Sequence, residues 1–281
     1  MKKETVELSR AIEKKHGTSY YIATLFLPKK IKREVFVLYA FVRTPDEYVD
    51  NPKEGEDPKE KLKGWKTDWQ KTFETGQGQN EILLATREIF KKHNIPFEVS
   101  IEFIDSMIQD LTVKRYRTYR SVQGYMRGSA EAVGVMLTYI FGYTEERAFD
   151  YARKLGEAMQ LTNFLRDIKE DYIERNRIYL PQEDLEKFGL TEEDIKNEDV
   201  NESFKEVMKY LIHKTRGLYK ESELGINMLS HKTQFGVRVA SRLYEKILDK
   251  IEKQNYDIYK KRARTNLLEK IWIILKTYVT H

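Results

Sequence analysis

The chain has 281 residues, of which 40% are hydrophobic and 34% are charged. Its 50 Lys and Arg residues against 45 Asp and Glu residues leave a net charge of only +5, and no nucleic-acid-reading motif accompanies this weak excess. With no cysteine, the sequence excludes disulfides, thiolate metal sites and cysteine nucleophiles. Its five histidines lie far apart, so a metal would be held mainly by oxygen ligands, which favours Mg²⁺, Mn²⁺ or Ca²⁺.

Hydrophobic residues recur with a helical period along the chain, and alternating strand patterns are absent. We expect helices at residues 3–15, 30–50, 58–74, 80–92, 97–113, 121–141, 145–175, 202–226, 230–253 and 256–277. No repeat or linker divides them, so we expect an all-α, single-domain protein over residues 1–281. The N-terminus lacks a signal peptide and no apolar run is long enough to span a bilayer, which predicts a soluble cytoplasmic protein.

The helix expected at residues 30–50 ends with a first acidic group. Asp46 and Asp50 are four residues apart, so on a helix their carboxylates lie one turn apart on the same face. Such a pair repels unless a cation or a proton neutralises it. Residues 44–47 also fit a capping box that starts a new helix, but the Asn-Pro pair at 51–52 would end that helix after two turns. We prefer one helix kinked near Pro45, with a divalent metal between the acids.

The helix expected at residues 145–175 carries a second polar stripe. It consists of Gln160, Asn163, Arg166, Asp167, Glu170, Asp171 and Glu174. At about 100° per residue these side chains share one face, opposite an apolar face. An ordinary solvated surface is one interpretation, although such surfaces usually mix both signs and here Arg166 is the only base. The other is a ligand set of Asn163, Asp167 and Asp171 that faces the first acids across a cavity and binds a diphosphate through Mg²⁺.

Several of these segments resemble the squalene/phytoene synthase family. Residues 160–171, QLTNFLRDIKED, followed by RIYLP at 177–181, are similar to its second aspartate-rich motif and the turn after it. YAFVR at 39–43, leading into the two acids of the first group, resembles the first motif. Weaker similarities lie at residues 16–19, 125–134 and 241–244, and the resemblance spans from residue 16 to about residue 262.

The chain departs from the family pattern at four positions. The middle acid of the first motif is Glu47 instead of aspartate, and Pro45 precedes the motif. Gly17 and Tyr20 replace a serine and a phenylalanine of the family.

The resemblance implies an isoprenoid-synthase-type helical bundle around a central cavity. It implies a Mg²⁺-dependent prenyltransferase, for which Mn²⁺ is a substitute ion and NADPH is needed only by a squalene synthase. The catalytic residues would be Asp46, Asp50, Asp167, Asp171, Arg43 and Arg166, and the metal ligands Asp46, Asp50, Asn163, Asp167 and Asp171. The substrate contacts would be His16, Ser19, Tyr39, Arg43, Gln160, Arg166, Tyr244 and Arg262.

The function implied is the head-to-head condensation of two prenyl diphosphates through a cyclopropyl diphosphate, with release of pyrophosphate. We expect two geranylgeranyl diphosphates to give phytoene. The alternatives are farnesyl diphosphate giving dehydrosqualene or squalene, an isoprenoid hydrolase or cyclase, and a non-catalytic scaffold. A scaffold should have lost the metal carboxylates, which this chain retains.

The C-terminal region combines a basic segment at residues 260–264 with an apolar run at 271–275. Two interpretations are open for it. An ordinary last helix with a solvated basic face is the one we prefer. The alternative is peripheral contact with a membrane surface, which would suit a water-insoluble product. The sequence does not indicate an oligomeric state.

Overall fold

The computed structural model describes residues 1–280, which form helices and no strand beyond two isolated bridges. The all-α prediction is confirmed. The helices are α1 Lys3–His16, α2 Thr18–Thr24, α3 Lys29–Asp50, α4 Pro58–Thr75, α5 Glu81–His93, α6 Phe97–Asp110, α7 Tyr119–Met126, α8 Ala132–Phe141, α9 Ala148–Arg175, α10 Gln182–Lys187, α11 Glu192–Lys196, α12 Glu202–Ile226, α13 His231–Lys253 and α14 Leu267–Val279. A π-helical turn, Arg127–Glu131, joins α7 to α8.

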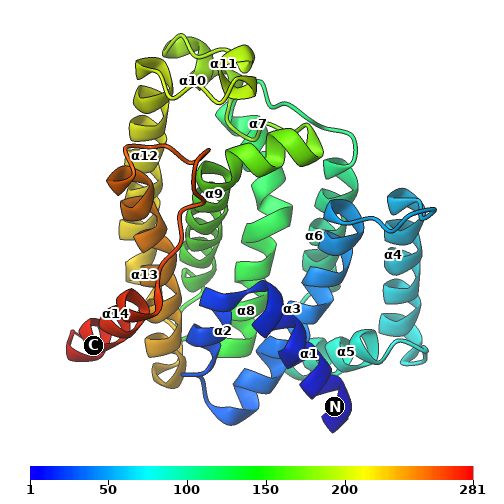
Figure 1. The fold of residues 1–281 in the computed structure, drawn as a ribbon. Helices are drawn as coiled ribbons and strands as arrows, with labels where there is room; N and C mark the ends of the chain where they lie inside the picture. The colour runs from blue at the N-terminus through cyan, green and yellow to red at the C-terminus, as the bar shows by residue number, and fades with distance from the viewer. Residues whose placement is uncertain (281) are drawn as a thin grey trace.

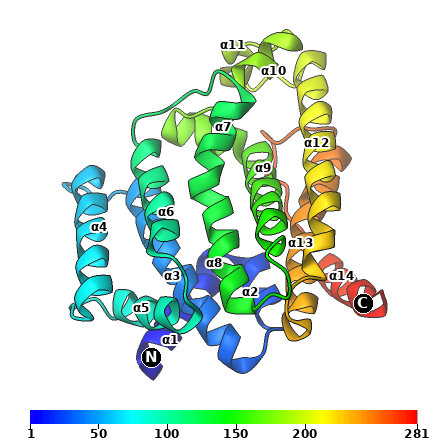
Figure 2. The same ribbon diagram turned by 180° about the vertical axis from the view of Figure 1, so that it is seen from behind.

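The helices form a bundle in which α8 and α9 lie at the centre. Both views show α12 and α13 on one side of this pair and α4 to α6 on the other (Figures 1 and 2). The C-terminal helix α14 lies at the edge of the bundle, packed against α13. In the described part of the chain, no helix combines the length and the apolar character needed to cross a membrane.

Helix α9 belongs to both large hydrophobic clusters of the core. Leu161 and Phe164 pack into the cluster formed mainly by α3 to α8, whereas Leu165 and Ile168 pack into the cluster formed with α12 and α13. The polar stripe of α9 occupies the face between these two apolar contacts. Because both flanks of the helix are fixed by packing, the stripe has one orientation, toward the interior of the bundle.

Helix α3 runs without interruption through Pro45, as the single-helix prediction required. The capping-box interpretation is therefore wrong. Proline has no amide N–H, so the carbonyl one turn before it loses its usual helical partner. The helix nevertheless continues to Asp50, which keeps both acids of the first group on one helical segment.

The prediction of a helix at residues 256–277 is wrong at its start. Asn255 and Tyr256 have φ angles of 53° and 62°, in the left-handed region, which ends α13 and turns the chain. An irregular segment follows, and α14 begins only after Asn266, whose side chain forms a capping box with Glu269. The short helices α2, α10 and α11 were also not predicted, because segments this short carry little periodicity.

The π-helical turn brings its backbone into close contact with α6. A Cβ atom added at Gly128 would lie 2.4 Å from the carbonyl oxygen of Glu102 and 2.6 Å from the Cβ atom of Ser106. Only glycine allows the two helices to approach this closely. The same turn contains Ser129 and Ala130, which line the interior cavity.

We expect Gly128→Ala to lower the free energy of unfolding by about 1–3 kcal/mol, because α6 must move to accommodate the methyl group. Gly124→Ala is the control, since its Cβ atom would meet no atom within 4 Å, and helix propensity predicts a gain of up to about 1 kcal/mol. Urea unfolding of both variants measures the difference. Equal stability changes would show that the close approach does not constrain the fold.

Candidate active site

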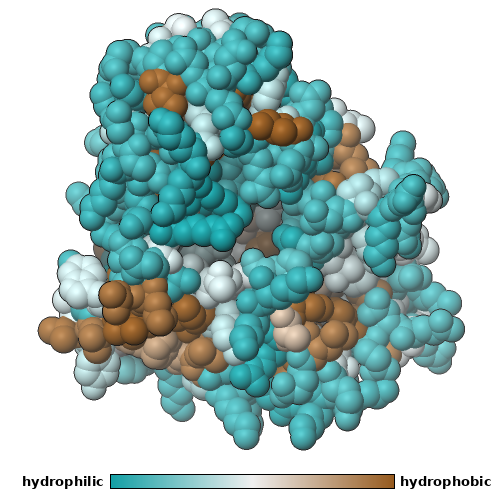
Figure 3. Space-filling model, in the orientation of Figure 1, coloured by the Kyte–Doolittle hydropathy of each residue, from teal (hydrophilic) through white to brown (hydrophobic). Residues whose placement is uncertain are grey.

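All thirteen predicted site residues line one polar cavity of about 610 Å³. They are His16, Ser19, Tyr39, Arg43, Asp46, Asp50, Gln160, Asn163, Arg166, Asp167, Asp171, Tyr244 and Arg262. They come from α1, α2, α3, α9, α13 and the segment before α14, so only the fold brings them together. Figure 3 shows a hollow near the centre of one face, bordered largely by hydrophilic residues.

The acids of α3 and α9 form two facing rims of this cavity, each paired with its own arginine. On α3, the Arg43 guanidinium contacts both Asp46 and Glu47. On α9, Nε of Arg166 donates to Asp167 over 2.8 Å. These are the arginines that the sequence pattern placed beside the acids.

One arginine that the sequence analysis missed bridges the two rims. Arg175 Nε lies 3.0 Å from an Asp50 carboxylate oxygen on α3, and Arg175 Nη1 lies 3.4 Å from an Asp171 oxygen on α9. The Arg175 side chain is only 12% exposed. Its four-residue spacing from Asp171 was the available signal, but spacing alone could not predict the contact with Asp50.

Beneath this bridge lies a second group of charged and polar residues, two of which belong to the RIYLP segment that resembles the family motif but was not assigned to the site. Asn176 ends α9 in the left-handed conformation, with φ of 52°, and turns the chain inward. Arg177 then lies 3.2 Å from both Asp50 and Asp110. Tyr179 donates its hydroxyl to Asp110 over 2.8 Å. Asp110 had no recognisable signal, because it is a single acid at the end of α6.

The irregular segment before α14 closes one side of the cavity. Arg262 donates from Nε and Nη2 to the two carboxylate oxygens of Asp167, over 2.7 and 2.8 Å. The backbone carbonyl of Tyr259 accepts a hydrogen bond from Lys169, which fixes the same segment to α9. A helix over residues 256–266 would not form these contacts, so the wrongly predicted segment is the one that carries Arg262 to the site.

The pKa shifts of the acids on the two rims show which carboxylates are not fully neutralised by the neighbouring arginines. Burial and the neighbouring Asp50 raise the pKa of Asp46 to about 7, despite Arg43. Burial and Asp167 likewise raise the pKa of Asp171 well above its usual value. Burial opposes ionisation of Asp167 too, but Arg166 and Arg262 donate to it and lower its pKa overall. Asp46 and Asp171 would therefore gain most from an additional cation.

The donor set fits a hard divalent cation in its chemistry. Across residues 1–280, no three His, Asp or Glu side chains converge closely enough to hold a metal ion as they stand. The reason lies in the contacts above, because every predicted aspartate ligand is engaged by at least one arginine. Carboxylate and amide oxygens are nevertheless the ligands that Mg²⁺ prefers.

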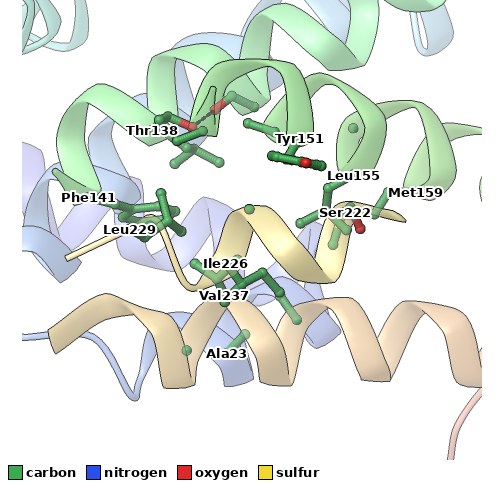
Figure 4. A pocket seen from close by; sticks show the side chains of 18 of the residues that line it. Ala23, Thr138, Phe141, Tyr151, Leu155, Met159, Ser222, Ile226, Leu229 and Val237 are labelled. Carbon is green, nitrogen blue, oxygen red and sulfur yellow. Dashed lines mark hydrogen bonds between the residues drawn. The ribbon is translucent and has the colours of Figure 1, made fainter. Parts of the chain in front are cut away.

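The cavity becomes apolar away from the rims. Tyr20 lies between Tyr39 and Tyr244, with ring centroids 6.3 and 6.0 Å away, and the three rings line the passage. Beyond Tyr20 the lining consists mainly of aliphatic and small residues from α2, α8, α9, α12 and α13. Figure 4 shows Leu155 and Val237 among the side chains around this apolar end.

The glycine at position 17 has a structural role in this wall. A Cβ atom there would lie 2.8 Å from the Tyr39 hydroxyl. The departure from the family serine thus allows the Tyr39 ring to lie against the backbone between α1 and α2.

The chain is similar in sequence to a family of known proteins. The family model described as Squalene/phytoene synthase matches residues 13–269. A 15-cis-phytoene synthase of Synechococcus elongatus is 30% identical over 272 residues, which cover 92% of this chain and 88% of the relative. A 15-cis-phytoene synthase of Synechocystis sp. is 32% identical over 275 residues, which cover 92% of this chain and 80% of the relative.

Two solved structures are similar over most of their length. A dehydrosqualene synthase in complex with ligand has a TM-score of 0.91 at 25% identity, with 99% of this chain and 96% of that chain covered. The squalene synthase HpnC from Alicyclobacillus acidocaldarius has a TM-score of 0.82 at 23% identity, with 90% and 95% covered. The second likeness concerns the fold alone.

We expect Arg175→Gln to bind Mn²⁺ about tenfold more tightly than the wild type in the absence of diphosphate, because a competing cation between Asp50 and Asp171 is removed. Titration followed by electron paramagnetic resonance of free Mn²⁺ measures the affinity. Arg117→Gln, which breaks an exposed pair with Glu186, is the matched control and should leave it unchanged. Unchanged or weaker Mn²⁺ binding by Arg175→Gln would contradict this role.

Proposed function

The chain belongs to the squalene/phytoene synthase family, and we propose that it condenses two molecules of geranylgeranyl diphosphate head to head to form phytoene. One observation carries this function: two acidic rims rich in arginine face each other across a cavity that continues into an apolar end. The polar part suits diphosphates and the apolar part suits prenyl chains. The retained carboxylates argue against a non-catalytic scaffold.

We propose that Asp46 and Asp50 on one rim, and Asn163, Asp167 and Asp171 on the other, hold Mg²⁺. When bound, the ion supplies positive charge that neutralises the departing pyrophosphate. The arginines of the site then exchange carboxylate oxygens for phosphate oxygens, which the planar guanidinium group also binds in a bidentate manner.

The phosphate contacts would come from a ring of polar side chains at the mouth of the cavity. Arg43, Arg166 and Arg262 provide positive charge from three different segments. His16, Ser19 and Gln160 add neutral donors beside them. His16 suits this role because burial and Arg43 lower its pKa, so it remains neutral at physiological pH and donates one N–H.

The carbocation formed when the C–O bond breaks would lie against the tyrosine rings of the passage. Aromatic faces attract positive charge by about 0.5–2 kcal/mol each without reacting with it. Burial raises the pKa of Tyr20, Tyr39 and Tyr244, so their hydroxyls stay protonated and are poor nucleophiles. The rings therefore stabilise the cation and keep water away from it.

The reaction balances without an oxidant or reductant. In the first half, one substrate loses its diphosphate, a C–C bond forms to the second, and a proton leaves to give a cyclopropyl diphosphate. In the second half, that intermediate loses its diphosphate, rearranges and loses another proton to give phytoene. Ionisation in both halves depends on the same rims.

Farnesyl diphosphate is the alternative substrate. The ligand-bound dehydrosqualene synthase structure, similar over 99% of this chain, favours this possibility. Its product would be dehydrosqualene, or squalene where NADPH supplies a hydride.

Incubation of the purified protein with Mg²⁺ and either diphosphate, with and without NADPH, distinguishes these functions. We expect phytoene from geranylgeranyl diphosphate, no dependence on NADPH, and no product after EDTA treatment. Mass spectrometry identifies the hydrocarbon. Preferential formation of a C30 hydrocarbon would show that farnesyl diphosphate, and not geranylgeranyl diphosphate, is the substrate. A prenyl alcohol or a cyclic terpene as the product would contradict head-to-head condensation.

Asp167→Ala and Asp171→Ala should each lower turnover by at least about 10²–10³-fold, because each removes an oxygen that stabilises the leaving group through the metal. Asp150→Ala is the matched control, because it removes an exposed aspartate from the same helix outside the cavity. We expect its turnover to stay within about twofold of the wild type. Circular dichroism verifies the fold of each variant. A wild-type rate in either aspartate variant would show that the substituted aspartate is not a metal ligand needed for turnover.

A further inference from the structure

The C-terminal helix exposes an apolar face to solvent. We call this the α14 face; its residues are Leu267, Leu268, Ile271, Trp272, Leu275, Tyr278 and Val279, which are 45–83% exposed. At 100° per residue they fall within an arc of about 140° on one side of the helix. Figure 3 shows hydrophobic colour gathered at the lower left, over the position of α14 in Figure 1.

Only a narrow stripe of α14 packs against the protein. Ile273 and Thr277 are its buried residues, and they face α13. An ordinary amphipathic helix packs its apolar side inward and exposes its polar side. Helix α14 does the reverse over most of its surface, so the solvated basic face expected for an ordinary last helix does not describe it. The outward apolar arc lacks a partner in the described chain.

The apolar surface continues from α14 to the turn between α2 and α3. The rings of Tyr278 and Phe235 lie 6.3 Å apart, and those of Phe235 and Phe26 lie 5.2 Å apart. Phe26 and its neighbour Leu25 are 40% and 41% exposed. Three segments that are distant in sequence therefore form one continuous apolar surface.

The apolar end of the active-site cavity lies directly behind this surface. Ala23 and Leu27, on either side of the exposed pair, line the cavity, and so do Gly236 and Val237, next to Phe235. A Cβ atom at Gly236 would lie 2.8 Å from the Leu27 side chain and 3.3 Å from the Ala23 carbonyl oxygen, so α13 packs directly against the end of α2 and the turn after it. The same short segments therefore line the cavity on one side and carry the exposed apolar side chains on the other.

Basic residues border the apolar surface. Lys29 and Lys30 follow the exposed turn, and Lys276 lies on the flank of α14. Arg242, on α13, donates to the hydroxyl of Thr280 at the end of α14. An apolar face with Trp and Tyr, flanked by lysine and arginine, is the composition of a protein surface that lies on an anionic bilayer.

We propose that the α14 face, together with the α2–α3 turn, docks on the surface of a bilayer that contains anionic lipid. The apolar side chains enter the boundary between headgroups and acyl chains, and the basic residues remain among the headgroups. The charge around the patch favours this occupant over a second copy of the chain, whose identical lysines would repel. Docking also places this wall of the cavity against the acyl chains, so that the hydrocarbon product can pass through the wall into the bilayer. The passage of product rests on the proposed function, whereas docking itself does not.

Vesicle sedimentation tests the docking without any turnover. We expect the wild-type protein to bind phosphatidylcholine vesicles that contain about 30% phosphatidylglycerol, and to bind pure phosphatidylcholine weakly. Added salt should reduce binding. The double variant Trp272→Glu/Leu275→Glu should lower the partition coefficient at least about tenfold, because it places two charges on the inserted face.

Leu224→Glu is the matched control, because Leu224 on α12 lies outside the patch and is 58% exposed, close to the 59% of Leu275. It should bind vesicles as the wild type does, and thermal unfolding checks that all three proteins are folded. Wild-type protein that stays in the supernatant with both vesicles would overturn the proposal. Equal binding by the double variant would also overturn it. Sedimentation velocity that shows a dimer lost in the double variant, without vesicle binding, would assign the face to a second copy.

Discussion

The ion pairs between the aspartates of α3 and α9 and the surrounding arginines are the constraint on which the site depends. Asp50, Asp167 and Asp171 are all largely buried, and ionised carboxylates in such positions cost several kcal/mol unless they are paired. Guanidinium groups supply that pairing from three segments of the chain. Guanidinium groups also bind phosphate, so the arginines that pair with these carboxylates fit the diphosphate site that we propose.

The packing of the bundle holds these charges in place. Because α9 is fixed between two apolar clusters, its polar stripe faces α3 and cannot turn toward solvent. The close contact at the π-helical turn and the irregular segment before α14 shape the remaining walls. The result is a cavity with a charged mouth, a tyrosine passage and an apolar end, which corresponds to the three parts of a prenyl diphosphate reaction: leaving group, cation and chain.

The sequence predicted the helical class and the main helices, because strong period-3.6 patterning reflects which side of each helix is buried. It also placed Asp46, Asp50 and the α9 stripe correctly on helices, and the fold brings all thirteen predicted residues to one cavity. It could not identify Asp110, or the bridge from Arg175 to Asp50, since both depend on contacts between distant segments. The segment at residues 256–266 was predicted as helix because left-handed residues at 255 and 256 have no glycine to mark them.

Anomalous diffraction from crystals grown with Mn²⁺ and inorganic pyrophosphate tests the central claim most directly. If the two rims form one metal-dependent diphosphate site, anomalous peaks will lie within coordination distance of carboxylates on both α3 and α9, with Arg175 moved from between Asp50 and Asp171. Peaks confined to other surfaces, with every arginine–aspartate pair of the rims intact and pyrophosphate elsewhere, would contradict the account.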